Sequence, residues 1–244
     1  MSDRANASAN RRADLTKKAI LRAAIREFSE HGLAGARTDT IAESAKVNKA
    51  LLYYYFQSKK GLYAAAIEEV SSVIAERAFA ALDPERSAGD RILRTALIHF
   101  DRIFTQRDFQ SLMQQEMVRV RRGESEGMPF LVRNVLKPLL EKLQQAVHEG
   151  IDSGELCQMD WLQVVYSVLG ANVLFFLSAP MMRLALDCDP MTPAAIEARR
   201  RTAVQFLGST LFVDRAHGAR LAKRVLAEMP MPKVPHPGVW RKFL

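Results

Sequence analysis

Residues 38–62 decide the fold, and they read TDTIAESAKVNKALLYYYFQSKKGL. In the first half of this stretch, apolar side chains share one face at helical spacing, namely Ile41, Ala42 and Ala45. In the second half, Leu52 and Phe56 lie four residues apart, as on the buried face of another helix. Only Lys46, Val47 and Asn48 separate the two segments. Two short helices joined by so tight a turn predict a helix-turn-helix.

Polar residues predict where these helices begin. Thr40 and Glu43 have the spacing of a capping box, which places the start of the first helix near Thr40. Asn48 is a favourable N-cap for a second helix over 49–55. The pattern directs several side chains of this second helix away from the core: Lys49, Ala50, Tyr53 and Tyr54.

A longer helix precedes this motif. From Asp14 onward the pattern is helical, with Ile20, Ala24 and Phe28 four residues apart on one face. Gly32 is a plausible C-cap, because glycine enters the left-handed conformation without steric cost. Residues 1–13 are rich in Ala, Asn, Ser and Arg without periodicity, and we expect them to form a mobile basic arm.

The rest of the chain is also expected to be helical, because strand alternation is absent. We expect a helix over 59–81 and then further helices near 88–105, 108–122, 129–152, 160–178, 192–212 and 214–229, with one of the breaks at Pro180. The predicted fold class is all-α: an N-terminal three-helix helix-turn-helix domain over 1–60, a helical bundle over 61–229 and a Pro-rich tail over 230–244.

Positive charge is concentrated in the first quarter of the chain. Residues 1–60 carry 12 Lys and Arg against 6 Asp and Glu, whereas the other 184 residues carry 23 against 21. Such a concentration is typical of a segment that meets a polyanion such as DNA. An ordinary basic surface explains the charge equally well, and an anionic membrane would also attract such a segment.

The sequence predicts a cytoplasmic protein that does not enter a membrane. The longest apolar stretch, 161–177, is shorter than the roughly 20 residues of a bilayer span and contains polar side chains. The N-terminus lacks the apolar segment of a secretion signal. Cys157 and Cys188 have no paired-ligand spacing, which fits a reducing compartment.

No pattern indicates catalysis. The five histidines are scattered, and the chain has no His-Glu-x-x-His, phosphate-binding glycine loop or nucleophile elbow. We therefore expect no catalytic residues, no metal site and no cofactor. The alternative is a helical enzyme whose ligands come together only in the folded chain.

The run from Thr38 to Leu62 strongly resembles the DNA-binding domain of TetR-family regulators. The residues that carry the resemblance are Thr38, Thr40-Ile41-Ala42, Val47 to Phe56, Ser58-Lys59 and Leu62. With the preceding helix, the resemblance covers roughly the first quarter of the chain, and the remainder agrees only in helical character. It implies an all-α homodimer that represses transcription and releases operator DNA when a small molecule binds.

The resemblance also implies roles for individual residues. Thr38 and Lys59 would meet phosphates at the starts of two helices, and Tyr53 and Tyr54 would contact the DNA backbone or bases. One of the three consecutive tyrosines is alternatively a packing residue. The remaining members of the expected interface are Thr40, Lys46 and the groove-facing Asn48, Lys49, Ala50 and Leu51.

Three positions depart from the family pattern. Lys46 stands where the family commonly has glycine, so a left-handed conformation there carries strain of about 1 kcal/mol. Its charge then offers an added phosphate contact. Tyr55 stands where histidine is common. Leu51 occupies a position that is often polar, and it favours a thymine methyl group.

An effector site is expected among aromatic and methionine side chains of the C-terminal domain. The candidates suit an apolar or aromatic molecule, although such residues at helical spacing are also ordinary core: His99, Phe100, Ile103, Phe104, Met113, Met117, Phe130, Phe175 and Phe176. The alternative is a regulator that answers a protein partner and binds no small ligand.

Two of the later helices carry apolar faces that predict a four-helix dimer interface. The expected interface residues are Val165, Leu169, Val173 and Phe176 on one helix and Ala203, Val204, Leu207 and Leu211 on the other. A core buried within one subunit is the competing explanation for the same pattern.

Overall fold

The computed structural model describes residues 2–125 and 127–233, and the regular elements in these ranges are all helices. One isolated bridge, between Leu156 and Phe212, accompanies them. The predicted all-α class is therefore confirmed. The chain divides into two compact units, Met1–Val73 with Arg107–Leu136 and Ile74–Gln106 with Lys137–Leu244.

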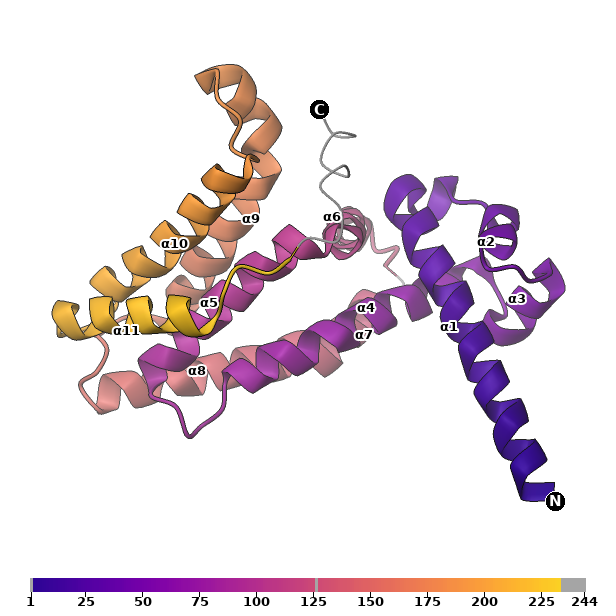
Figure 1. Ribbon diagram of the computed structural model, residues 1–244, viewed down its shortest axis with the longest axis horizontal. Coiled ribbons are helices and arrows are strands. Elements are labelled where there is room, and N and C mark those ends of the chain that lie inside the picture. The colour runs from indigo at the N-terminus through magenta and orange to yellow at the C-terminus, as the bar shows by residue number, and fades with distance from the viewer. Residues whose placement is uncertain (1, 126, 234–244) are drawn as a thin grey trace. The chain divides into compact units, whose positions relative to one another are not determined.

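The first unit is built around a long N-terminal helix (Figure 1). Its helices are α1 (Ser2–Gly35), α2 (Thr38–Ser44), α3 (Lys49–Phe56), the first part of α4 (Lys59–Ala81), α6 (Arg107–Arg121), α7 (Met128–Leu131) and the π-helix η1 (Val132–Leu136). As the spacing predicts, Ile20, Ala24 and Phe28 of α1 are fully buried. Gly32 interrupts the helical backbone of α1 with a φ of 66°.

The expected N-terminal arm is helical. The helix α1 begins at Ser2, so residues 2–13 continue it rather than forming an irregular segment. The physical reason is composition: Ala and Arg are strong helix formers, and neither Gly nor Pro occurs before Gly32. The lack of an apolar period in 2–13 means that this part of α1 carries no continuous apolar stripe in its sequence.

The helix α6 belongs to the N-terminal unit, although the sequence places the domain boundary at residue 60. Ser111 Oγ and Gln115 Nε2 both donate to the Ser29 carbonyl of α1, at 2.7 and 3.2 Å. Ser29 Oγ in turn lies 3.1 Å from Asp108 Oδ1. Phe109 is buried on the same helix. These contacts join α6 to α1, a pairing that local sequence patterns do not reveal.

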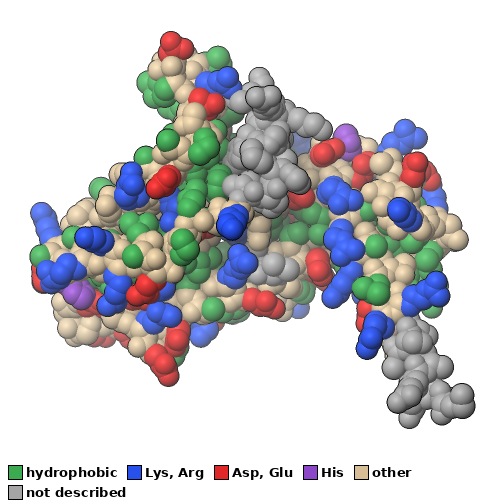
Figure 2. Space-filling view, viewed as in Figure 1, with side chains coloured by type: hydrophobic (Ala, Val, Ile, Leu, Met, Phe, Trp, Pro, Cys, Tyr) green, Lys and Arg blue, Asp and Glu red, His purple; other side chains and the backbone are tan. Residues whose placement is uncertain are grey.

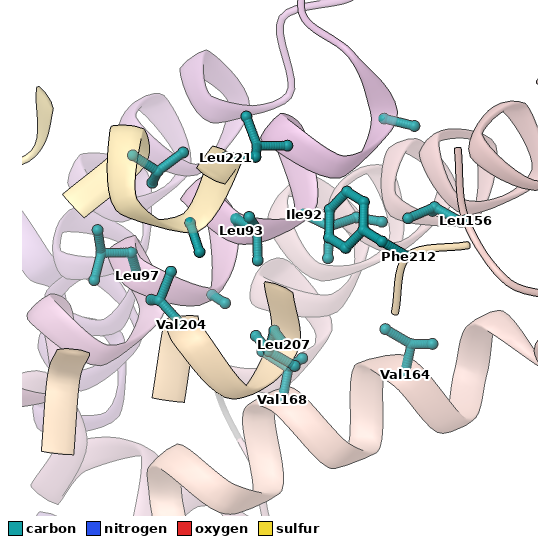
Figure 3. Packing of buried hydrophobic residues seen from close by; sticks show 14 of the residues in the cluster. Ile92, Leu93, Leu97, Leu156, Val164, Val168, Val204, Leu207, Phe212 and Leu221 are labelled. Atoms are coloured by element: carbon teal, nitrogen blue, oxygen red, sulfur yellow. The ribbon is translucent and has the colours of Figure 1, made fainter. Parts of the chain in front are cut away.

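The second unit is centred on α5 (Ala88–Thr105). Packed against it are α8 (Lys137–Asp152), α9 (Trp161–Leu186), α10 (Pro193–Thr210) and α11 (Arg215–Glu228). Figure 3 shows how their side chains meet around α5, with Leu93 and Leu97 between Val204, Leu207 and Leu221. Burial of this apolar set is the main stabilising contribution to the unit.

The helices α10 and α11 approach each other closely where two glycines meet. A Cβ atom at Gly208 would lie 2.6 Å from the carbonyl oxygen of Gly218, and one at Gly218 would collide with the carbonyl oxygen of Gly208. Both residues are buried. The crossing therefore requires that neither helix carries a side chain at this point.

The helix α9 continues through Pro180, where the sequence predicts a break. Proline removes one backbone hydrogen bond, but Phe175 and Phe176 pack with Ile196 of α10 on one side of it, and Ala179 is buried. Packing thus outweighs the local preference.

By length and composition alone, α9 is the one helix of the described residues that would cross a membrane. The polar Asn172 in its middle is nevertheless buried, and its amide donates to the Ala96 carbonyl of α5 at 3.1 Å. Val164 and Val168 lie in the core of the second unit. One face of α9 therefore packs in the core of the second unit.

Candidate nucleic-acid interface

The turn between α2 and α3 has the conformation that the sequence predicts. Lys46 adopts a φ of 56°, in the left-handed region. The amide of Val47 donates to the Ala42 carbonyl at 3.0 Å, which closes the turn. Asn48 caps α3, because its side chain accepts a hydrogen bond of 2.7 Å from the Leu51 amide.

The predicted capping box at Thr40 and Glu43 is wrong. The helix α2 begins two residues earlier, at Thr38, and its N-cap is Arg37, whose side chain makes no capping hydrogen bond. The Arg37 amide instead donates to Glu27 Oε1 of α1 at 2.9 Å. A carboxylate from another helix therefore satisfies a donor next to the start of α2, and no local spacing reveals it.

One face of α3 is buried and the opposite face is open. Leu52 and Phe56 are buried, as expected. The open face carries most of the residues that were expected to read DNA: Asn48, Lys49, Ala50 and Tyr54 are exposed, and Leu51 and Tyr53 are partly exposed. Tyr54 has 79% of its surface exposed, which is unusual for an aromatic side chain and marks it as free to contact a partner.

Three contacts hold the side chains around α3. The Thr38 hydroxyl, which is buried, lies 3.3 Å from the Tyr53 hydroxyl. Lys49 Nζ donates to Asp39 of α2 at 2.9 Å, and this hydrogen bond raises the pKa of Lys49. Lys59 Nζ donates to the Ala34 carbonyl at 3.1 Å. The carboxylate of Asp39 was missed by sequence analysis, since its partner is ten residues away and on a different helix.

The same unit carries further exposed basic side chains. Lys18, Arg22 and Arg37 are exposed in the same unit, together with Lys46. Figure 2 shows blue side chains on the surface of this part of the chain. Thr40, on the outer side of α2, is exposed as well. The α3 face is therefore an exposed helix within a basic surface, the arrangement that suits a helix entering the major groove of DNA.

The nine expected effector-lining residues fall into two sets. Met113, Met117 and Phe130 lie in the first unit, where Met117 is 62% exposed. The others lie in the second unit: His99, Phe100, Ile103, Phe104, Phe175 and Phe176. Within this second set, the four phenylalanines pack with Ile196. Phe100 of this aromatic cluster also lines a cavity of about 280 Å³, together with residues of α9 and α10.

His99 is held uncharged in the second unit. Its Nδ1 atom lies 3.3 Å from the amide nitrogen of Asn172. Desolvation by burial, with a smaller contribution from the charge of Arg102, lowers the pKa of His99 from 6.5 to about 3.

Three of the eight expected dimer residues are buried inside the subunit. Val165, Val204 and Leu207 are buried among side chains of the same chain, and this corrects their assignment to an interface. Leu169, Val173, Phe176, Ala203 and Leu211 are partly buried. Helical spacing identifies an apolar face, but it does not distinguish the face that packs inside one chain from the face that meets another.

A different set of apolar side chains is exposed on the same two helices. On α9 these are Tyr166, Leu174, Leu177, Met181, Leu184 and Leu186, and on α10 it is Phe206. Green hydrophobic side chains are visible along α9 and α10 in Figure 2. Exposed apolar surface of this extent is typical of a protein interface.

The short α2, the tight turn at Lys46 and the exposed α3 define the class: this is a helix-turn-helix protein with a helical second unit. Residues 20–66 match the bacterial regulatory proteins of the tetR family, and residues 90–207 match the tetracyclin repressor-like C-terminal domain. The HTH-type transcriptional dual regulator CecR of Shigella flexneri is 32% identical over 151 residues, which span 57% of this chain and 67% of CecR. The chain belongs to the tetR family.

Other relatives agree over shorter stretches or in fold alone. The HTH-type transcriptional repressor SCO4008 of Streptomyces coelicolor is 46% identical over 56 residues, 23% of this chain and 29% of that repressor. The chain thus spans less than a third of the length of the first relatives that it matches. The regulator FadR of Bacillus subtilis, solved in complex with stearoyl-CoA, has a similar fold, with a TM-score of 0.59 and 20% identity over 78% of this chain and 96% of FadR.

Proposed function

We propose that this chain is a cytoplasmic, sequence-specific DNA-binding regulator that represses transcription as a homodimer and is not an enzyme. The observation that carries the proposal is the exposed first turn of α3, with Asn48, Lys49 and Ala50 open to solvent beside a buried Leu52 and Phe56. Family membership supports the same function, since SCO4008 is named a repressor.

On operator DNA, α3 enters the major groove. Lys49, Ala50 and Leu51 face the base edges and set the preferred sequence. Lys46, Tyr54 and Lys59 contact the phosphate backbone and position the helix without reading sequence. Lys59 exchanges its hydrogen bond with the Ala34 carbonyl for a phosphate oxygen, which is a stronger, charge-assisted partner.

A small-molecule effector releases the DNA. The helix α4 supplies this coupling, because one continuous helix runs from Lys59 in the DNA-binding unit to Ala81 in the second unit. An effector shifts the equilibrium only if it binds the form with low DNA affinity more tightly, and operator DNA must weaken effector binding by the same factor. The stearoyl-CoA bound to FadR shows that a relative of similar fold accepts a small molecule.

The dimer forms through the exposed apolar faces of α9 and α10. Leu174, Leu177 and Met181 of α9 and Phe206 of α10 are each more than half exposed. Pairing of two copies would remove these side chains from water. Two subunits then present two recognition helices to two half-sites of one operator.

The test is selection of genomic fragments by the purified protein at moderate salt. We expect one preferred, two-fold symmetric site, and an affinity that falls steeply as salt rises, because phosphate contacts release counterions. Substitution of Lys49 or Leu51 by Ala should change the selected sequence. Arg220→Ala, at an exposed position of the second unit, is the matched control and should not. Absence of any preferred site would contradict the proposal.

A further inference from the structure

The cavity of about 280 Å³ in the second unit lies between α5, α9 and α10. Its buried side consists of core side chains, among them Val168, Val204 and Leu207, which Figure 3 shows together. Its outer side reaches the exposed face of α10, where Thr202 and Phe206 lie. The volume is close to the lower end of the roughly 300–1,000 Å³ that is usual for small-molecule sites. The cavity therefore suits a compact ligand.

Among the described residues that line the cavity, Arg199 of α10 is the only one with an ionisable side chain. Its guanidinium lies 5.6 Å from the centre of the Phe175 ring. Its Nη2 atom donates to the Ala171 carbonyl at 3.3 Å. Neither partner is an anion, so these contacts leave the positive charge of Arg199 without a balancing negative charge.

The same side chain is poorly solvated. Burial lowers the pKa of Arg199, and no carboxylate of the described residues counteracts this shift. The Nε atom of Arg199 is buried and makes no hydrogen bond within the described part of the chain. A buried donor without an acceptor costs free energy. A ligand that is negatively charged and accepts a hydrogen bond from Nε would remove both costs.

The rest of the lining restricts the ligand further. Phe100, Val204 and Leu207 supply apolar surface, which suits a hydrocarbon body. Asn172 is already engaged, because its amide nitrogen donates to the Ala96 carbonyl at 3.1 Å. A single arginine balances one negative charge, so a phosphate dianion would bring a second charge into the cavity without a partner. A carboxylate carries one charge and matches the planar guanidinium.

We infer that this cavity binds a small monocarboxylic acid with a compact apolar body, whose carboxylate pairs with Arg199. The inference rests on the proposed function, because it assigns the effector site of the proposed regulator and the chemical class of its ligand. Phe206 borders the cavity and also lies in the proposed dimer face, so a ligand bound here would lie beside the second subunit.

The test uses three probes that share a benzene ring and differ in the polar group: benzoate, benzamide and phenyl phosphate. Binding to the full chain without DNA is measured by calorimetry and by thermal shift. We expect benzoate to bind, and the neutral amide and the phosphate to bind about tenfold more weakly or less. Binding of benzamide or phenyl phosphate as tight as that of benzoate, or no binding of benzoate at millimolar concentration, would overturn the inference.

Variants locate the binding. Arg199→Gln should weaken benzoate binding about tenfold, because it removes a charge-assisted interaction. Arg201→Gln, at an exposed position of the same helix outside the cavity lining, is the matched control and should leave binding unchanged. Ala203→Leu keeps Arg199 and fills part of the cavity, so it should also reduce binding. Ala203 is partly exposed, so this variant does not depend on how well the Arg199 variant folds.

Unchanged benzoate binding in the Arg199 variant or in the Ala203 variant would place the ligand elsewhere. Selection of operator DNA by the wild-type protein is measured separately and without probes. A chain that binds benzoate through Arg199 but selects no DNA contradicts the proposed function alone. A chain that selects DNA but binds no benzoate contradicts only the inference about the cavity.

Discussion

Lys46 combines a strained backbone with an exposed charge in the turn before α3. A left-handed conformation costs a residue with a side chain about 1 kcal/mol, and asparagine tolerates it better than lysine. Lys46→Asn should therefore keep the turn and its stability while it removes the charge. We expect weaker binding to all DNA sequences and a salt dependence that is shallower by about one unit in a log–log plot.

Lys46→Gly separates the two effects of this position. Glycine relieves the backbone strain and also removes the charge, so it should lower DNA affinity as much as asparagine does. The measurement is affinity for one operator and one unrelated duplex across a salt series. Wild-type affinity in both variants at every salt concentration would show that Lys46 touches no phosphate.

His99 should make the stability of the protein depend on pH. Its pKa is about 3 in the folded chain and about 6.5 in the unfolded chain. Between these values the unfolded chain binds a proton that the folded chain excludes, so acid favours unfolding. The free energy of unfolding should fall as pH drops below 6.5, by up to about 1 kcal/mol between pH 6.5 and 5.5 from this residue alone.

The measurement for His99 is urea unfolding at several pH values and one fixed protein concentration. His99→Gln should lose this part of the pH dependence, because glutamine does not titrate. His148→Gln, at an exposed position of α8, is the matched control and should behave like the wild type. Equal pH dependence in the His99 variant and the wild type would show that folding does not lower the pKa of His99.

Among single residues, those features that depend on near neighbours in the chain could be predicted from the sequence. The cap at Asn48 and the left-handed Lys46 depend on neighbours within three or four residues, and both are confirmed. The capping box at Thr40 failed because Glu27 of another helix supplies the contact beside the start of α2. A single polar contact between two helices, such as this one, leaves no periodic signal in the sequence.

Between elements, the ion pair of Asp39 and Lys49 joins α2 to α3. Asp39 is exposed and places a negative charge next to the face that would meet phosphates. Asp39→Asn should strengthen binding to unrelated DNA, because it removes repulsion and leaves Lys49 free to contact the duplex.

The same variant should discriminate less well between operator and unrelated DNA, since Lys49 is no longer held in one position. Binding of both duplexes by fluorescence anisotropy tests this expectation. Glu43→Gln removes another exposed acid of α2, and it serves to subtract the effect of net charge. If Asp39→Asn and Glu43→Gln change both affinities equally, the ion pair does not position Lys49.

The ends of the helices were predicted less well than the presence of each helix. Most helix positions were found from apolar spacing, yet α9 runs through Pro180 and α1 begins at Ser2. In α9, the packing of Phe175 and Phe176 with Phe100 of α5 and Ile196 of α10 outweighs the proline, and such packing becomes visible only in the folded chain. The grouping of α6 with α1 is likewise a property of the tertiary structure.

In the proposed dimer, two copies of the chain pair through the apolar face of α10 that is exposed to solvent. Phe206 is 62% exposed, whereas its neighbour Leu207 is 8% exposed. Phe206→Asp should yield folded monomers with much weaker operator binding, because one subunit engages only one half-site. Leu207→Asp should instead destabilise the subunit, since it places a charge in the core.

Sedimentation and thermal unfolding of the two variants distinguish these effects. We expect the melting temperature of the Phe206 variant to stay above that of the Leu207 variant. A Phe206 variant that still sediments as a dimer would contradict the proposed interface. Sequence alone could not choose between the two faces of α10 for the proposed dimer, because the helix carries the buried Leu207 on one face and the exposed Phe206 on the other.

The meeting of Gly208 and Gly218 constrains how sequences with this fold can diverge. A larger residue at either position would push the backbones of α10 and α11 apart. The other position is already glycine, so no substitution there can make room, and both positions must stay glycine together. In a saturation library selected for repression, both codons should stay glycine while surface codons of the same helices drift. The helix α10 also carries Phe206 of the proposed dimer interface. We therefore expect Gly208→Ala to weaken or alter dimer formation before it causes the subunit to unfold.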